Sequence, residues 1–266
     1  DEVHDRTIFI DTIIGFLHQE LEKIDNFPCQ ITLMTATMDH SILKSLGKRS
    51  KNISLPSYSP YPVIEKRVTL DRRVSKIPSI VVNCLFDILA DIRSGTFELG
   101  HILIFVAGNA DCQRILREIR EKVEMTNKDS QKKNVKKIIL IHVPIDEKST
   151  VQSVYQDIEK EAYNPNHIYI VPIQLAGYVN QVQKTVAQNP LPRNLRNVIK
   201  IIVSTNIVES SITILDLAAV IDSGFYNQAK FDPKTEITKI TKEPISAKMA
   251  IQRKGRVGRT RKGIYV

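Results

Sequence analysis

The sequence predicts an α/β fold in which helices cover both faces of a parallel sheet. Three observations predict it. Short, continuous apolar runs recur along the 266 residues, helix-spaced apolar positions separate them, and no internal repeat is present. The apolar runs that we expect to form strands are residues 31–34, 52–55, 101–107, 138–143, 168–173, 199–204 and 218–222.

The first part of the chain should contain two helices and end in a linker. Apolar residues at three- and four-residue intervals predict an amphipathic helix, with Ile10, Ile13, Ile14, Leu17, Leu21 and Ile24 on one side. Asp39 can cap a short helix that stops at Gly47. The segment 56–62 has three prolines, which resist regular structure. It is the expected linker between two domains, 1–58 and 59–266.

The remaining elements alternate between helix and strand. A helix is predicted from Ser79 to Ile92, and another follows the strand 101–107. The lysine-rich stretch 124–137 is expected to be a solvated loop. Residues 226–241 contain two alternating runs around a turn sequence, which predicts a β-hairpin.

Composition narrows the class of protein. The net charge is +9 and the isoelectric point about 9.4, which favours a polyanionic partner. No apolar run approaches the length of a membrane span, and no signal-peptide pattern opens the chain. The three cysteines lack metal-ligand spacing. We therefore expect reduced thiols in a soluble, intracellular protein without a zinc site.

Two short polar motifs lie in the first part of the chain. "DEVH" opens the sequence, and its carboxylates at Asp1 and Glu2 suit Mg²⁺, which prefers one or two carboxylates plus phosphate oxygens and water. "TAT", residues 35–37, directly follows an expected strand. Each also has a plain interpretation, as surface polarity for the first and as a strand-end turn for the second.

A hydroxyl-rich segment follows a later strand. "STNIVESSITI" occupies residues 204–214, and the next strand closes with "VIDSGF", residues 220–225. Hydroxyls and free backbone N–H groups at a strand end can hold phosphates without reading bases. The alternative is an ordinary βα loop with helix-capping serines.

The most basic stretch is "QRKGRVGRTRKG", residues 252–263. On a helix, Arg256 and Arg259 would share one face, with Gln252 one turn earlier. Guanidinium groups suit a transferring γ-phosphoryl group, whose charge spreads over several oxygens. The three glycines indicate a close approach of backbone or ligand. The alternative is a basic tail that touches nucleic acid.

In this order, the four motifs resemble those of superfamily 2 helicases of the DExH/DEAH type. "DEVH" with valine and "QRKGRVGR" with lysine are similar to the poxvirus nucleoside triphosphate phosphohydrolase II branch, so the resemblance extends to a viral protein of the cytoplasm or virion. It covers nearly the whole chain. It implies RecA-like sheets: the end of a first domain, 1–58, and a nearly complete second domain, 59–266.

The resemblance also implies a role for each site residue. Asp1 and Glu2 would hold Mg²⁺, Glu2 would polarise the attacking water, and His4 would link the nucleotide site to the opposite domain. The residues implied in coupling and in contacts to nucleic-acid phosphates are Thr35, Thr37, Thr205, Asn206, Glu209 and Ser211. Gln252 would position the water, with Arg256 and Arg259 as fingers on ATP. The hairpin would separate strands, with Phe225, Tyr226 and Phe231 as apolar or stacking surface.

No glycine-rich loop of the form G-x-x-x-x-G-K-[ST] is present, so the phosphate-binding loop is expected upstream of Asp1. The implied function is an ATP-dependent helicase that unwinds RNA, or DNA, with 3′→5′ polarity, and this fragment alone is expected to be inactive. Two alternatives stay open. One is a catalytically inert RNA-binding scaffold with a helicase fold, and the other is a translocase on duplex DNA.

Overall fold

The structure is a computed structural model, and it describes residues 3, 8–23, 30–35, 44, 51–55, 59–69, 76–130, 136–177, 179–210 and 212–266. The chain divides into two compact units, Asp1–Tyr58 and Ser59–Val266. The division falls within the proline-rich segment that predicts a linker. Among the described residues, no helix combines the length and the apolar composition needed to cross a bilayer.

The first unit contains one long described helix, α1 (Ile8–Lys23), as the apolar spacing predicts. The predicted strands 31–34 and 52–55 are wrong, because residues 30–35 and 51–55 have no regular secondary structure. Val3 N–H donates to Met34 O at 3.2 Å, but no ladder of such bonds forms within the described residues. A strand is stable only where a neighbour pairs with its backbone. The helix expected between Asp39 and Gly47 lies, apart from residue 44, outside the described residues.

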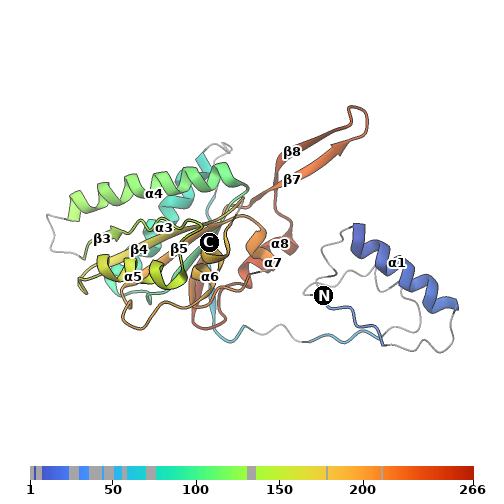
Figure 1. The fold of residues 1–266 in the computed structure, drawn as a ribbon, viewed down its shortest axis with the longest axis horizontal. Coiled ribbons are helices and arrows are strands. Elements are labelled where there is room, and N and C mark those ends of the chain that lie inside the picture. Colours follow the sequence, from blue (N-terminus) through green and yellow to red (C-terminus); the bar gives the residue numbers. More distant parts are fainter. Residues whose placement is uncertain are drawn as a thin grey trace. The chain divides into compact units, whose positions relative to one another are not determined.

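The second unit is built on a parallel sheet of seven strands, in the order β1-β9-β6-β2-β5-β4-β3 (Figure 1). Its strands are β1 (Val63–Glu65), β2 (His101–Phe105), β3 (Ile138–Leu140), β4 (Ile168–Leu175), β5 (Val198–Ser204), β6 (Leu217–Asp222) and β9 (Gly263–Tyr265). Two further strands, β7 (Phe225–Asp232) and β8 (Ile237–Pro244), form an antiparallel hairpin that projects from the sheet. The predicted α/β class and the hairpin are confirmed.

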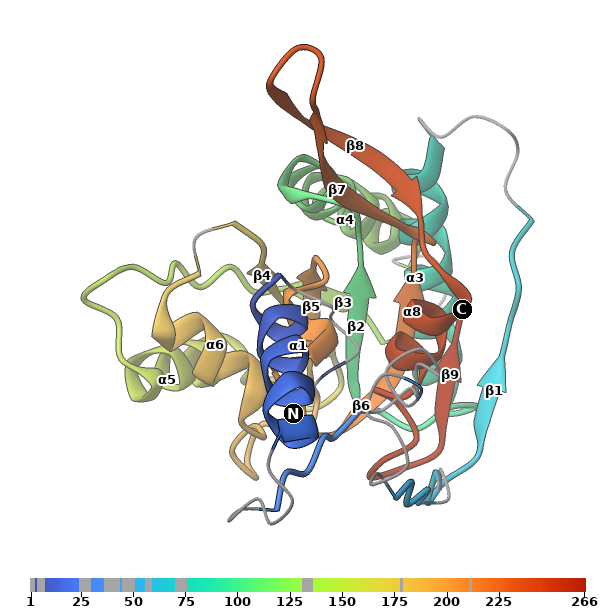
Figure 2. The same ribbon diagram turned by 90° about the vertical axis from the view of Figure 1, so that its right-hand side faces the viewer.

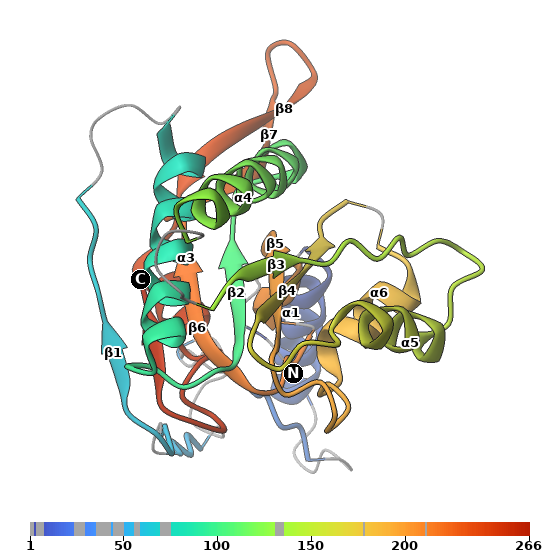
Figure 3. The ribbon, with the colours of Figure 1, turned by 90° about the vertical axis from the view of Figure 1, so that its left-hand side faces the viewer.

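Helices cover both faces of this sheet, as Figures 2 and 3 show from opposite sides. The helices α3 (Ile77–Ser94) and α4 (Asn109–Ser130) pack on one face against Ile102 and Ile104 of β2. On the other face, α5 (Val151–Glu161) and α6 (Gln181–Gln188) pack against Leu103 and Phe105. Successive side chains of β2 therefore point to opposite faces of the sheet, and helices bury both faces. Two short helices, α7 (Ile207–Ser210) and α8 (Ala247–Lys254), follow β5 and the hairpin.

The helix α4 is longer than the sequence predicts. Residues 124–130 continue it, where a solvated loop was expected. The reason is a contact that is distant in sequence: the Asn127 side chain donates to Ile138 O at 2.7 Å and accepts from Ile138 N at 3.2 Å. These two bonds tie the last turns of α4 to the start of β3.

Residues 59–62 are attached to the second unit rather than free. The Ser59 hydroxyl and Tyr61 N–H both donate to Gly258 O, at 3.0 and 3.2 Å. Gly258 has φ +81°, and a Cβ there would lie 2.5 Å from both Ser59 Oγ and Val63 Cγ2. Gly258 in the basic stretch therefore lets residues 59–63 pack closely against its backbone.

Replacing Gly258 with alanine should destabilise the chain by about 2 kcal/mol or more, because a left-handed residue costs roughly 1–2 kcal/mol and the new methyl group overlaps its neighbours. Gly224→Ala is the matched control. Gly224 also has a positive φ, +75°, but nothing lies within 4 Å of its Cβ position. Urea denaturation should therefore show the larger loss for Gly258→Ala. Equal losses would mean that packing at Gly258 is not the cause.

Candidate functional site

Polar groups gather where β5 ends. Ser204 is fully buried, and its hydroxyl lies 2.9 Å from both Leu175 O and Thr205 O. Thr205 N–H donates to Leu175 O at 3.4 Å, so the backbone after β5 is tied to the end of β4. Thr205 is half-buried and Asn206 is exposed. The loop therefore offers a hydroxyl and an amide at the carboxyl edge of the sheet, where ligands of such sheets bind.

Several predicted site residues cannot be placed with these. Thr35 lies in the first unit, in the irregular segment 30–35. Asp1, Glu2, His4, Thr37, Ser211 and the side chain of Glu209 lie outside the described residues. Their roles stay predictions.

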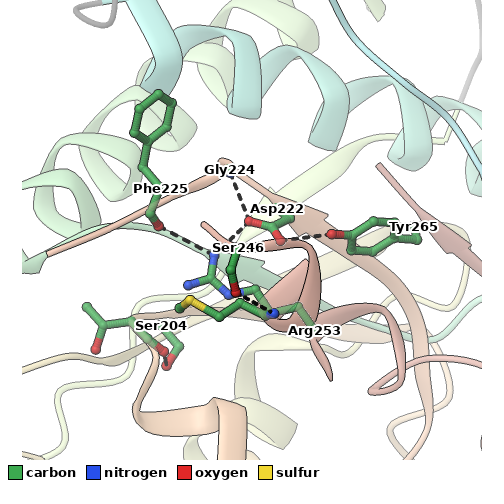
Figure 4. Close-up of polar contacts among 9 residues, drawn as sticks. Ser204, Asp222, Gly224, Phe225, Ser246, Arg253 and Tyr265 are labelled. Carbon is green, nitrogen blue, oxygen red and sulfur yellow. Dashed lines mark hydrogen bonds and ion pairs between the residues drawn. The ribbon is translucent and has the colours of Figure 1, made fainter. Parts of the chain in front are cut away.

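A buried ion pair joins the end of β6 to α8 (Figure 4). Arg253 has no exposed surface, and its Nη1 lies 2.7 Å from Asp222 Oδ1, whose side chain is also buried. The same nitrogen donates to Phe225 O at 3.4 Å, and the guanidinium lies over the Phe105 ring at 4.8 Å. Arg253 therefore fixes α8 against the end of the sheet and the base of the hairpin.

Besides Arg253, two further groups donate hydrogen bonds to the Asp222 carboxylate. Gly224 N–H donates to Oδ1 at 2.8 Å, and the Tyr265 hydroxyl donates to Oδ2 at 2.9 Å. Burial, together with the charge of Asp222, raises the pKa of the Tyr265 hydroxyl. The hydroxyl thus remains a proton donor across the physiological range.

The basic stretch does not form the continuous helix that the spacing of Arg256 and Arg259 suggested. The helix α8 ends at Lys254, with Gly255 as its C-cap. Both arginines lie in the turns that follow, so the argument from a shared helix face is wrong. Arg256 is half-buried and its Nη1 donates to Ile212 O at 3.0 Å, while exposed Arg259 donates from Nε to Gly255 O at 2.8 Å.

The cations of this stretch divide into two groups. Arg253, Lys254 and Arg261 pair with the carboxylates of Asp222, Glu65 and Asp216. These three cations therefore make ion pairs within the folded chain, and they are not the two arginines that the family resemblance implies as fingers on ATP. Among the described residues, Arg259 has no carboxylate partner. The contact of Arg256 with Ile212 O places its guanidinium beside the loop that follows α7.

The three aromatic residues named for the hairpin lie in different surroundings. Phe225 is half-buried and packs against the core beneath α3 and α4, which leaves it little free surface. The half-buried Tyr226 donates its hydroxyl to Gln228 Oε1 at 3.2 Å. Phe231 is 62% exposed. Of the three, Phe231 is the one that presents a largely free ring.

Comparison with known proteins shows which proteins this chain resembles. No protein-family model matches the chain. It is 31% identical over 267 residues to the ATP-dependent RNA helicase HrpA of Borreliella burgdorferi, and 28% identical over 263 residues to an ATP-dependent RNA helicase of Schizosaccharomyces pombe. Each match covers 99% of the chain. Over nearly its whole length, the chain is therefore similar in sequence to ATP-dependent RNA helicases.

The fold is similar to that of a solved helicase structure. A crystal structure of the Escherichia coli DEAH/RHA helicase HrpB superposes with a TM-score of 0.65 at 20% identity, over 100% of this chain and 27% of that one. The chain spans 33% and 26% of the yeast and Borreliella helicases. The relatives come from a yeast and a bacterium, so the expected proximity to the poxvirus enzymes gains no support from them.

Sequence reasoning did not single out Ser204, Asp222 or Arg253 in this site. One signal was present. Asp222 directly ends an apolar strand, and a carboxylate that follows buried residues needs a cation or hydrogen-bond donors nearby. Nothing in the sequence indicated which of the clustered cations would supply the partner. Asp216, which pairs with Arg261 and has φ 63°, was also missed.

Proposed function

We propose that the protein containing this chain is an ATP-dependent RNA helicase of the DEAH type. The observation that supports it most is the combination of homology to RNA helicases over 99% of the chain with the position of the motif segments, at the carboxyl ends of β5 and β6 and around α8. ATP hydrolysis would drive movement along a single strand in the 3′→5′ direction, as the family resemblance implies. RNA is the proposed substrate, and DNA is the alternative polyanion.

In this proposal, α8 and the turns that follow it supply the groups that act on ATP. Gln252 orients the attacking water, and Arg256 and Arg259 neutralise charge that develops on the γ-phosphate. Gln252 is half-buried on α8, directly before buried Arg253. The ion pair of Arg253 with Asp222 therefore restricts where Gln252 and the following turn can lie.

Magnesium and the nucleotide require residues from elsewhere. Asp1 and Glu2 are the proposed Mg²⁺ ligands, and His4 is the proposed link to the opposite domain. The chemistry of two adjacent carboxylates fits a cation that binds few protein oxygens. The proposal also assigns the units 1–58 and 59–266 to the end of a first RecA-like domain and to most of a second.

The loop after β5 is the proposed nucleic-acid contact. Thr205 and Asn206 would hydrogen-bond phosphates, with Glu209 and Ser211 shaping the loop and Thr35 and Thr37 coupling hydrolysis to domain movement. Phosphate contacts are independent of base sequence, so binding should be sequence-blind and should weaken steeply with salt. Free thiols at Cys84 and Cys112 are compatible with a reducing cytoplasm, the compartment that we propose.

The test is ATP hydrolysis by the complete protein, with and without single-stranded RNA, followed by strand displacement from duplexes with a 3′ or a 5′ overhang. We expect RNA to stimulate hydrolysis and a 3′ overhang to support displacement. RNA binding without hydrolysis would favour the inert scaffold. DNA-stimulated hydrolysis without displacement would favour a duplex translocase. Either result would reject the helicase assignment.

A further inference from the structure

The hairpin β7–β8 has two distinct faces. In an antiparallel pair, directly opposed residues lie on the same face, and every second pair along the strands shares it. The register therefore assigns one face, here called the clamp face, to the pairs Phe225–Pro244, Asn227–Lys242, Ala229–Ile240 and Phe231–Thr238. The opposite face has Tyr226–Glu243, Gln228–Thr241, Lys230–Lys239 and Asp232–Ile237.

The base of the clamp face contacts the start of α4. Lys242 Nζ lies 2.7 and 3.0 Å from the two carboxylate oxygens of Asp111, in the first turn of α4. The residue opposite Lys242 is Asn227, whose side chain rests on Gly108, just before α4. A Cβ at Gly108 would overlap Asn227 Nδ2. One cross-strand pair thus makes both contacts, one ionic and one steric.

Beyond this contact, the same face is apolar and exposed. Ile240 is 72% exposed and Phe231 is 62% exposed. They are diagonal neighbours, with Ala229 opposite Ile240. Figures 1 and 2 show the outer part of the hairpin extending beyond α4. Exposed apolar side chains gathered on one face of a projecting element indicate a surface that binds something.

An isolated two-stranded hairpin is only marginally stable in water, so its direction depends on what its base contacts. Each strand has eight residues, which at about 3.3 Å per residue makes a lever of roughly 26 Å. A rotation of about 20° at the base would move the far end by roughly 9 Å. A modest contact at the base therefore decides where Phe231 and Ile240 lie.

We propose that Asp111, Asn227 and Lys242 form a clamp that sets the angle of the hairpin, so that the face with Phe231 and Ile240 meets the end of the duplex. These are positioning residues for strand separation, and they do not act on ATP. The inference rests on the proposed helicase function. It predicts a separation of two activities: loss of the clamp should lower unwinding and leave hydrolysis nearly unchanged.

The experiment uses charge reversal in the complete protein: Lys242→Asp, Asp111→Lys, and both together. Each single variant should unwind an overhang duplex about tenfold more slowly, with RNA-stimulated hydrolysis within about twofold of wild type, because one attraction becomes a repulsion. The double variant restores the pair in reverse and should recover most of the unwinding. Lys239→Asp is the matched control, since it makes the same charge change on the opposite face of the same strand.

A second readout does not depend on activity. With the native cysteines replaced, spin labels on Lys128→Cys of α4 and Lys234→Cys at the hairpin turn report the distance between the two elements. The distance distribution should broaden in each single reversal and narrow again in the double variant. Unchanged distances would reject the clamp, as would an unwinding loss from Lys239→Asp as large as that from Lys242→Asp. If the wild-type protein neither hydrolyses ATP nor unwinds a duplex, the helicase proposal fails. The spin-label distances would then be the remaining test of whether Asp111 and Lys242 hold the hairpin.

Discussion

Replacing Arg256 with alanine in the complete protein is expected to lower RNA-stimulated ATP hydrolysis about a thousandfold, the lower end of what arginine fingers contribute. The γ-phosphoryl group spreads its charge over several oxygens, and a guanidinium fork meets two of them at once. Arg256 is half-buried beside Ile212 O, which restrains its side chain before a nucleotide arrives. Arg256→Lys keeps the charge but not the fork, so we expect little recovery.

Lys262→Ala is the matched control, because it removes one positive charge from an exposed position of the same stretch. It should hydrolyse ATP like wild type. RNA affinity of Arg256→Ala, measured by fluorescence anisotropy at fixed salt, should stay near the wild-type value. Hydrolysis that survives in Arg256→Ala would contradict the finger assignment. An equal loss of hydrolysis in Lys262→Ala would mean that the positive charge of the whole stretch, and not the Arg256 guanidinium, causes the effect.

The second large effect is expected from Asp222→Asn, which should destabilise the 266-residue chain by about 3–5 kcal/mol. The substitution keeps the shape of the side chain and removes the charge that compensates Arg253, which has no exposed surface. For a unit of this size, about 1 kcal/mol corresponds to roughly 2–4 °C in Tm. Urea denaturation followed by circular dichroism measures the loss.

Two companion variants make this result specific. Lys254→Met breaks an ion pair with Glu65 in which both side chains are about 40% exposed, and it should change stability little. The double variant Asp222→Leu with Arg253→Met removes both buried charges and should recover most of the stability lost in Asp222→Asn. A loss from Lys254→Met as large as that from Asp222→Asn would mean that burial is not what makes this pair important.

The sheet could be predicted because β2, β4, β5 and β6 are buried on both faces, which leaves continuous apolar runs in the sequence. The short strands β1 and β9 left no such run. Each has three residues, and they were missed because their pairing depends on the turn around Gly258. The end of α4 was misjudged for a similar reason, since Asn127 finds its partner in β3.

The site was predictable in outline and not in detail. The order of strands and motifs along the chain indicated which segments meet at the carboxyl edge of the sheet. It did not indicate how the six cations of the basic stretch are divided, because their partners Glu65, Asp216 and Asp222 lie 31 to 189 residues away along the chain. Ion pairing over such separations is a property of the folded chain, and residue spacing within a motif does not encode it.

Ser59 and Tyr61 both hold the carbonyl of Gly258, two residues after Arg256 and one before Arg259. The second unit begins at Ser59, so the first residues of that unit are bonded directly to the turn between the two arginines, ahead of β1 and the sheet.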